Sequence, residues 1–254
     1  MKLSIVVPAY NETKRIGRIL DAYLAYFLPR YESEVEIIVV VNGSRDDTAD
    51  IARTYSARHP QVSVIEVKEA IGKGGAVIVG FKHAVGDLVG FADADGSTPP
   101  EAFDDLAVNI DSSGAIIASR WFAESVVEPR HPLKRRIISR IFNFMVRTFF
   151  GMDIHDTQCG AKVLSRAAVQ RILPHLGITR WAFDVDLLFQ VHRAGYAIKE
   201  WPTVWHDEAG SQLRIVRASI EMFIAIVRLR LIYSPLRWVV TVYDRTLGRL
   251  FMRS

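Results

Sequence analysis

Two carboxylates, Asp93 and Asp95, stand one residue apart directly after a mostly apolar run at residues 87–92. The run predicts a buried strand that ends in the two acids. Carboxylate oxygens suit Mg2+ or Mn2+, and an ion held by only one or two of them keeps positions free for substrate phosphates. The alternative is that these acids only cap the helix that residues 97–101 predict. The elements around the pair must decide between the two interpretations.

Those elements alternate between short apolar runs and amphipathic stretches. Strands are predicted at 3–8, 35–41, 62–67, 115–118 and 197–205, and helices at 16–27, 49–58 and 72–84. Continuous apolar strands between helices predict an α/β fold with a mostly parallel sheet covered on both faces. Ligands of such sheets bind beyond the carboxyl ends of the strands, where Tyr10–Glu12, Asn42–Ser44 and Asp93–Asp95 would meet. This convergence favours a nucleotide or phosphate site over a helix cap.

Two other groups of residues could contribute to this crevice. Lys73 lies in Gly-Lys-Gly-Gly, which has neither the phosphate-loop spacing nor the dinucleotide fingerprint, so it either touches phosphate or is solvated. Asp184 and Asp186 open a predicted helix in an apolar setting. Acids two residues apart point to different sides of a helix, so at most one of them faces a common site unless they belong to the turn before the helix. Because a buried, unpaired carboxylate is costly, we expect a functional or capping role for at least one.

Charge is distributed unevenly over the 254 residues. Residues 1–119 hold 11 Lys and Arg against 17 Asp and Glu, whereas residues 120–254 hold 21 against 11. The basic half suggests a negatively charged partner, for which nucleic acid, anionic lipid and a phosphorylated substrate are candidates. The single cysteine, Cys159, excludes a disulfide framework and favours a reducing compartment. We expect neither a signal peptide nor a membrane-spanning helix.

Much of the positive charge lies in segments that also carry bulky apolar residues. In the helix predicted at 133–150, Arg136, Arg140 and Arg147 share one face and aromatic residues occupy much of the rest. Such a helix lies in a membrane interface or packs on the core with a charged outer face. A second segment of this kind, an apolar helix at 215–233 followed by a tail with Trp238, favours the interface.

Several ordered motifs resemble glycosyltransferase family 2, whose catalytic domain has the GT-A fold. In the first half they are Val-Pro-Ala-Tyr-Asn-Glu at 7–12, Asn-Gly-Ser at 42–44, Gly-Lys-Gly at 72–74 and Asp-Ala-Asp at 93–95. In the second half, Asp-Thr-Gln-Cys-Gly-Ala-Lys at 156–162, Arg-Trp-Ala-Phe-Asp-Val-Asp at 180–186 and Gly-Ser-Gln-Leu at 210–213 look like eukaryotic-type dolichyl-phosphate glucosyltransferases. The resemblance implies a GT-A domain over 1–212, with a nucleotide-sugar half (1–119) and an acceptor half (120–212). Membrane-associated amphipathic helices would follow at 213–254.

The resemblance also implies roles for particular residues. The nucleotide sugar would be bound by Pro8, Tyr10, Glu12, Asn42, Lys73 and Asp93; the metal, Mg2+ or Mn2+, by Asp95 and Asp93; the acceptor phosphate by Arg120, Arg136, Gln158, Ser211 and Arg214. Asp93, Asp95, Arg120, Asp184 and Asp186 would form the catalytic set. There are departures: Val41-Asn42 stands where family members often have two Asp, and Gln212 stands where a Lys is common.

The implied activity is inverting, metal-dependent transfer of glucose from UDP-glucose to a polyprenyl (dolichyl) phosphate, by a protein bound peripherally at the cytoplasmic face of a membrane. A phosphate monoester, with a second pKa of about 6, is already largely dianionic at neutral pH, so it needs no general base. We therefore expect Asp184 and Asp186 to orient substrate. Alternatives are a dolichyl-phosphate mannose synthase using GDP-mannose, transfer of another UDP-sugar, a nucleotidyltransferase, and a non-catalytic nucleic-acid-binding protein. The last is disfavoured because bulky aliphatic residues interrupt the basic segments, so no nucleic-acid partner is expected.

Overall fold

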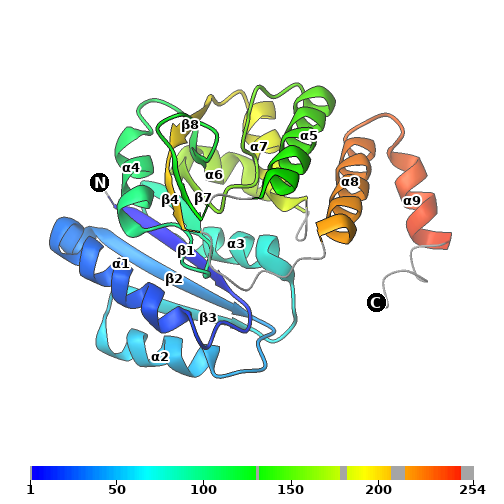
Figure 1. The fold of residues 1–254 in the computed structure, drawn as a ribbon. Coiled ribbons are helices and arrows are strands. Elements are labelled where there is room, and N and C mark those ends of the chain that lie inside the picture. The colour runs from blue at the N-terminus through cyan, green and yellow to red at the C-terminus, as the bar shows by residue number, and fades with distance from the viewer. Residues whose placement is uncertain (1, 130–131, 178–181, 207–214, 247–254) are drawn as a thin grey trace.

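A seven-stranded sheet forms the centre of the computed structural model, which describes residues 2–129, 132–177, 182–206 and 215–246 (Figure 1). Its strands lie in the order β3-β2-β1-β4-β7-β5-β8. Their bounds are β1 Leu3–Ala9, β2 Val35–Asn42, β3 Val62–Val67, β4 Leu88–Ala92, β5 Ala115–Ser119, β7 Ala161–Ser165 and β8 Ile198–Pro202. All seven residues of β1 are buried, as the continuous apolar run predicts for a strand covered on both faces.

One strand of this sheet runs against the others. β7 pairs antiparallel with both β4 and β5, whereas every other pairing in the sheet is parallel. The carboxyl ends of β1, β2, β4 and β5 therefore meet the beginning of β7 at one edge. The prediction of a mostly parallel sheet is confirmed, and β7 brings the segment before it, residues 156–160, to the edge where the acids lie.

Helices cover both faces of the sheet. α1 (Ile16–Tyr31), α2 (Thr48–Arg58) and α4 (Pro100–Asn109) pack on one face through a cluster that includes Leu20, Phe27 and Phe103. On the other face lie α3 (Gly72–His83), α6 (Arg166–Ile172) and α7 (Phe183–Arg193), joined by a cluster that includes Val77, Phe91 and Phe183. Short 3-10 turns, η1 (Glu32–Glu34) and η2 (Leu173–His175), follow α1 and α6.

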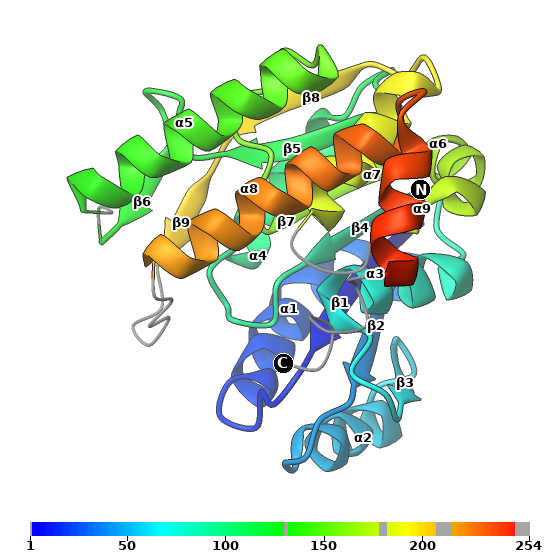
Figure 2. The same ribbon diagram turned by 90° about the vertical axis from the view of Figure 1, so that its right-hand side faces the viewer.

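Three further helices extend the second face. α5 (Leu133–Phe150) and α8 (Ile215–Ile232) lie side by side and share a cluster with α7 that includes Phe142, Val146 and Ile226 (Figure 2). α9 (Arg237–Thr246) packs against α8. The helix predicted at 133–150 is thus confirmed. No helix within the described residues is both long enough and apolar enough to span a bilayer.

The strand predicted at 197–205 is wrong in its extent. β8 ends at Pro202, and β9 (Val204–His206) pairs instead with β6 (Val126–Glu128) in a separate two-stranded sheet. Proline has no N–H to continue a ladder, and the next residue, Thr203, donates its N–H to Ser125 Oγ at 3.2 Å. The small sheet therefore anchors the segment that follows β5.

Candidate active site

A cluster of opposite charges lies at the edge of the sheet where the acids were expected. Lys73, in the first turn of α3, has its Nζ 2.8 Å from Asp93 Oδ1 and 3.1 Å from Asp93 Oδ2. The same Nζ is 3.5 Å from Oδ2 of Asp184, in the first turn of α7. Three residues predicted from separate motifs are thus brought together around one ammonium group.

Two glycines allow these elements to approach so closely. A Cβ at Gly74 would lie 2.4 Å from the Phe183 ring, so glycine lets α3 reach the start of α7. A Cβ at Gly160, just before β7, would lie 2.2 Å from Asp93 Oδ2. Gly160 also accepts a hydrogen bond from Asp93 N–H at 3.1 Å through its carbonyl. Neither position tolerates a side chain without moving the charged cluster.

Lys162 is a member of this cluster that the sequence reasoning missed. It lies on β7, is fully buried, and its Nζ donates to Asp184 Oδ1 at 2.6 Å and to the Cys159 carbonyl at 2.7 Å. A single lysine inside the apolar run Ala-Lys-Val-Leu was the available signal, because such a residue needs a buried partner. Lys162, Asp184, Lys73 and Asp93 therefore form a chain of alternating charges.

The pKa values of Asp184 and Asp93 in this chain of charges are shifted in opposite directions. Burial alone raises the pKa of Asp184, but the charges of Lys162 and Lys73 outweigh it and hold that pKa below its ordinary value. For Asp93, burial is the larger effect and raises the pKa, although Lys73 opposes it. The pKa of Lys73 is raised, because Asp184 and Asp93 overcome the effect of burial. Asp184 is thus a stabilised carboxylate and a weak proton acceptor.

Asp95 lies beside this cluster in a tight turn. Its Oδ1 accepts the N–H of Ser97 at 2.9 Å, and Gly96 between them has φ +79°. Among the residues that the structure describes, no three His, Cys, Asp or Glu side chains are grouped to hold a metal. The arrangement fits a Mg2+ or Mn2+ ion that takes one or two carboxylates here and its remaining ligands from substrate.

The loops after β1 and β2 are bound to one another. Asn42 is buried and its Nδ2 donates to the Ala9 carbonyl at 3.1 Å, so it supports the end of β1. Glu12 donates its backbone N–H to Thr48 Oγ1 at 2.8 Å, and its carboxylate accepts from Arg15 at 2.6 and 2.9 Å. Burial raises the pKa of Glu12 despite that arginine. Pro8 is buried within β1, whereas Tyr10 is half exposed at the edge of the sheet.

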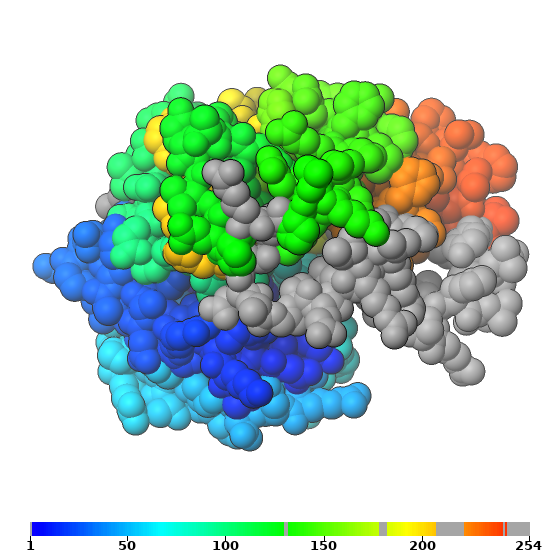
Figure 3. All heavy atoms as spheres, viewed as in Figure 1, coloured from blue at the N-terminus to red at the C-terminus, as the bar shows by residue number. Residues whose placement is uncertain are grey.

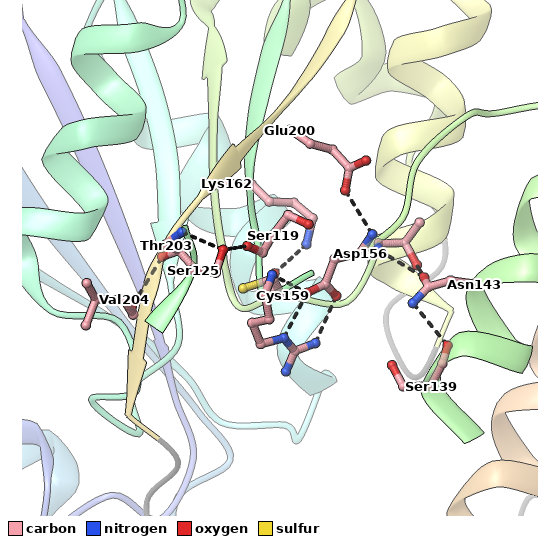
Figure 4. Close-up of polar contacts among 12 residues, drawn as sticks. Ser119, Ser125, Ser139, Asn143, Asp156, Cys159, Lys162, Glu200, Thr203 and Val204 are labelled. Carbon is pink, nitrogen blue, oxygen red and sulfur yellow. Dashed lines mark hydrogen bonds and ion pairs between the residues drawn. The ribbon is translucent and has the colours of Figure 1, made fainter. Parts of the chain in front are cut away.

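Arg120, at the end of β5, is held by a buried acid. Its Nε and Nη2 donate to the two carboxylate oxygens of Asp156 at 2.8 and 2.9 Å, and its backbone N–H donates to the same group. Asp156 is in turn positioned by Glu200, which accepts its N–H at 2.9 Å (Figure 4). Arg120 is therefore oriented through β8, which carries Glu200.

Asp186, predicted as a catalytic residue, lies on another side of α7 from Asp184. It is fully buried, and Tyr233 from the end of α8 donates its hydroxyl to Asp186 Oδ1 at 2.7 Å. Residues two apart on a helix differ by about 200° in direction, so Asp184 and Asp186 cannot face one crevice. Burial, followed by the hydrogen bond to Asp186, raises the pKa of Tyr233. In this geometry Asp186 joins α7 to the end of α8, and its catalytic role stays a prediction.

The remaining predicted residues are those that the family resemblance assigns to the acceptor phosphate. Arg136 is exposed on α5 and lines, with Arg120, a cavity of about 640 Å3. Gln158 is partly exposed in the segment before β7. Ser211 and Arg214 lie outside the described residues.

Comparison with known proteins shows which family this chain resembles in sequence and in fold. The model of glycosyl transferase family 2 matches residues 4–173. A dolichyl-phosphate beta-glucosyltransferase of Drosophila melanogaster is 36% identical over 226 residues, covering 84% of this chain and 69% of the relative. One of Trichomonas vaginalis is 34% identical over 248 residues, covering 93% of this chain and 73% of the relative. Glucosyl-3-phosphoglycerate synthase from Mycobacterium tuberculosis, solved with Mn2+ and UDP-glucose, is similar in fold, with a TM-score of 0.66 at 20% identity over 90% of this chain and 78% of that one.

Proposed function

Because the chain belongs to glycosyl transferase family 2, we propose that it transfers glucose from UDP-glucose to a polyprenyl (dolichyl) phosphate with inversion at the anomeric carbon. The observation that carries the proposal is the match to dolichyl-phosphate beta-glucosyltransferases over most of this chain and more than two thirds of theirs. The cluster around Lys73 supports it, because it unites motifs from both halves of the sequence.

The charged edge of the sheet around Asp93 and Asp95 suits the donor. Asp95, with Asp93 beside it, would hold a divalent ion, which supplies positive charge for the donor diphosphate. Lys73 is close enough to Asp93 to interact with the same phosphates, where negative charge develops as the sugar departs. Tyr10 and Glu12, at the adjoining edge, would contact the base and ribose.

Asp184 fits an orienting role better than a proton-accepting one. The lowered pKa that Lys162 and Lys73 impose makes its carboxylate a poor base. A phosphate monoester acceptor needs no general base, because it is largely dianionic at neutral pH. We expect Asp184 to hold a sugar hydroxyl while the acceptor oxygen attacks.

Peripheral attachment to a membrane would give access to a lipid acceptor. Four large apolar side chains of α5 recur at helical spacing and are 50–68% exposed: Leu133, Ile137, Ile141 and Phe144. Basic residues of the same helix would face lipid headgroups, and exposed Trp238 on α9 suits the interface. Replacing Ile141 and Phe144 by Ser should reduce binding to anionic vesicles about 10-fold, as loss of partly buried apolar area predicts. Unchanged binding in a flotation assay would refute this part of the proposal.

The test of the activity uses the purified full chain with Mn2+ or Mg2+, a polyprenyl phosphate and radiolabelled nucleotide sugars. We expect label from UDP-glucose in organic-extractable lipid, no transfer to the matched polyprenol, and a β-linked product by NMR. Transfer only from GDP-mannose, or only from another UDP-sugar, would show that this nucleotide sugar is the donor and that UDP-glucose is not. Absence of transfer from every donor would refute the proposal.

A further inference from the structure

The loop after β1 is held by the loop after β2 and by the start of α2. The β1 loop spans residues 10–15 and the β2 loop residues 43–47, both in the blue part of the chain, which is seen at the surface in Figure 3. Three successive backbone N–H groups of the β1 loop donate to side chains of these elements: Asn11 N–H to Ser44 Oγ at 3.0 Å, Glu12 N–H to Thr48 Oγ1 at 2.8 Å and Thr13 N–H to Asp46 Oδ2 at 3.2 Å. We call this set of contacts the loop clasp.

Further contacts complete the loop clasp. In the reverse direction, Arg45 donates its backbone N–H to Asn11 Oδ1 at 2.9 Å. Asn11 has φ +55°, a left-handed conformation that asparagine adopts more readily than most residues. Asp46 joins the β2 loop to α2, because its Oδ1 accepts both the backbone N–H of Thr48 at 3.2 Å and the Thr48 hydroxyl at 2.5 Å. The Thr48 hydroxyl therefore donates to the β2 loop while it accepts from the β1 loop.

The loop clasp occupies donors of a kind that commonly bind phosphate. Successive backbone N–H groups between a strand and a helix form an anion site in many proteins. In this chain the N–H groups of residues 11–13 are already bonded to side chains, so a donor diphosphate would have to break the clasp to use them. The β1 loop therefore contributes side chains to the site: Tyr10, 50% exposed, and Glu12, whose carboxylate is held by Arg15 at 2.6 and 2.9 Å.

Holding the β1 loop in place before a ligand arrives favours binding. A loop that becomes ordered only when its ligand binds loses conformational entropy at that moment, and the affinity falls accordingly. The loop clasp orders this loop when the protein folds. An aromatic ring suits stacking against a nucleobase, and a carboxylate accepts hydrogen bonds from ribose hydroxyls, so Tyr10 and Glu12 together suit a nucleoside.

We propose that Ser44, Asp46 and Thr48 are positioning residues for the nucleoside part of the donor. Through the loop clasp they hold Tyr10 and Glu12 in the arrangement that binds base and ribose, and they contact no ligand themselves. The identity of the donor rests on the proposed function, whereas the dependence of the β1 loop on these three side chains rests on the clasp. None of the three belongs to the residues for which the family resemblance implies a role.

The test measures binding of UDP and, separately, of pyrophosphate to the full chain by isothermal titration calorimetry with Mn2+ present. Ser44→Ala, Asp46→Ala and Thr48→Val each remove part of the loop clasp, whereas Thr48→Ser keeps the hydroxyl and serves as the rescue. Thr54→Val is the matched control, because the Thr54 hydroxyl, also on α2, donates within its own helix to the Asp50 carbonyl at 3.0 Å. Ser44 is partly exposed, so its variant keeps the test open if Thr48→Val does not fold.

We expect each clasp variant to bind UDP about 3–10-fold more weakly, the usual effect of losing a hydrogen bond, while Thr48→Ser and Thr54→Val bind as the wild type does. Binding of pyrophosphate should not weaken, because the clasp holds nothing that contacts the diphosphate. With UDP-glucose as donor, KM should rise while kcat stays unchanged, the pattern of lost binding. Partial unfolding would instead lower the number of binding sites per molecule.

Wild-type affinity for UDP in Ser44→Ala and Thr48→Val, or an equal loss for pyrophosphate or in Thr54→Val, would overturn the inference. If the wild type binds GDP and not UDP, the proposed donor fails, and the same variants titrated with GDP decide the role of the clasp. A wild type that binds neither nucleotide would refute both proposals. If UDP binding depends on the clasp but the protein transfers glucose to no prenyl phosphate, the proposed function fails and the positioning role stands.

Discussion

Replacing Lys162 by Met tests whether the buried charge chain holds the active site together. The substitution keeps the length of the side chain and removes an ammonium that is fully buried 2.6 Å from Asp184. Removing one partner of a buried ion pair costs about 3–5 kcal/mol, because the other charge remains buried without it. Lys73 stays 3.5 Å from Asp184 and compensates in part, so we expect the lower end, ~3 kcal/mol. For a protein of this size that corresponds to a fall in Tm of about 6–12 °C.

The informative measurement is a double-mutant cycle that combines Lys162→Met with Asp184→Asn, with the stability of each variant measured by thermal unfolding. Asp184→Asn alone removes the carboxylate that pairs with Lys162 and leaves its buried ammonium donating to the Cys159 carbonyl at 2.7 Å. The double variant removes both charges, so it should be more stable than the sum of the single losses predicts, by about 1–3 kcal/mol. Losses that add within about 0.5 kcal/mol would show that the two residues do not interact and would refute the charge chain.

Three further predictions concern residues around this chain. Asp95→Asn should weaken Mn2+ binding by more than the roughly 10–100-fold that follows loss of a residue behind a metal ligand. The loss should also exceed that in Asp93→Asn, because Asp93 is already paired with Lys73. Electron paramagnetic resonance of Mn2+ in the presence of UDP measures both affinities, and equal effects would contradict this difference between the two acids. Burial by itself raises the pKa of Asp46, but the hydrogen bonds from Thr13 and Thr48 together outweigh it and lower that pKa from 3.8 to about 2. The contribution of Asp46 to stability is therefore complete above pH 3.8 and disappears as the pH falls through about 2. Asp46→Asn should therefore lower Tm at pH 7 by an amount that shrinks toward pH 2, and a constant difference would disprove the shift. Tyr233→Phe should lower stability by about 1–3 kcal/mol by depriving buried Asp186 of a donor, yet leave kcat unchanged, and a large loss of kcat would return Asp186 to the catalytic set.

Local patterns were sufficient to predict most of the elements. The apolar runs identified the strands around Asp93, and the rule that ligands bind beyond strand ends placed the loops at 10–12, 42–44 and 93–95 at one edge. The position of Lys73 was left open between a phosphate contact and a solvated side chain. Spacing also predicted that at most one of Asp184 and Asp186 faces a common site if both lie on the helix. It could not tell which one faces the charged cluster around Lys73, because that depends on what covers the other side of α7. Tyr233, which donates to Asp186 there, comes 47 residues further along the chain.

The direction of β7 is the feature that local pattern leaves undetermined, and the site depends on it. A short, buried strand such as β7 is compatible with either direction in a covered sheet, since both faces are buried in each case. Only the antiparallel course places the beginning of β7 at the carboxyl ends of β4 and β5. There, Gly160 meets Asp93, Lys162 reaches Asp184 and Asp156 orients Arg120. The motif at 156–162 therefore joins the cluster around Asp93 to the ion pair that holds Arg120. Substitutions within it should disturb the binding of both proposed substrates, whereas those at Asp95 should affect the nucleotide sugar alone.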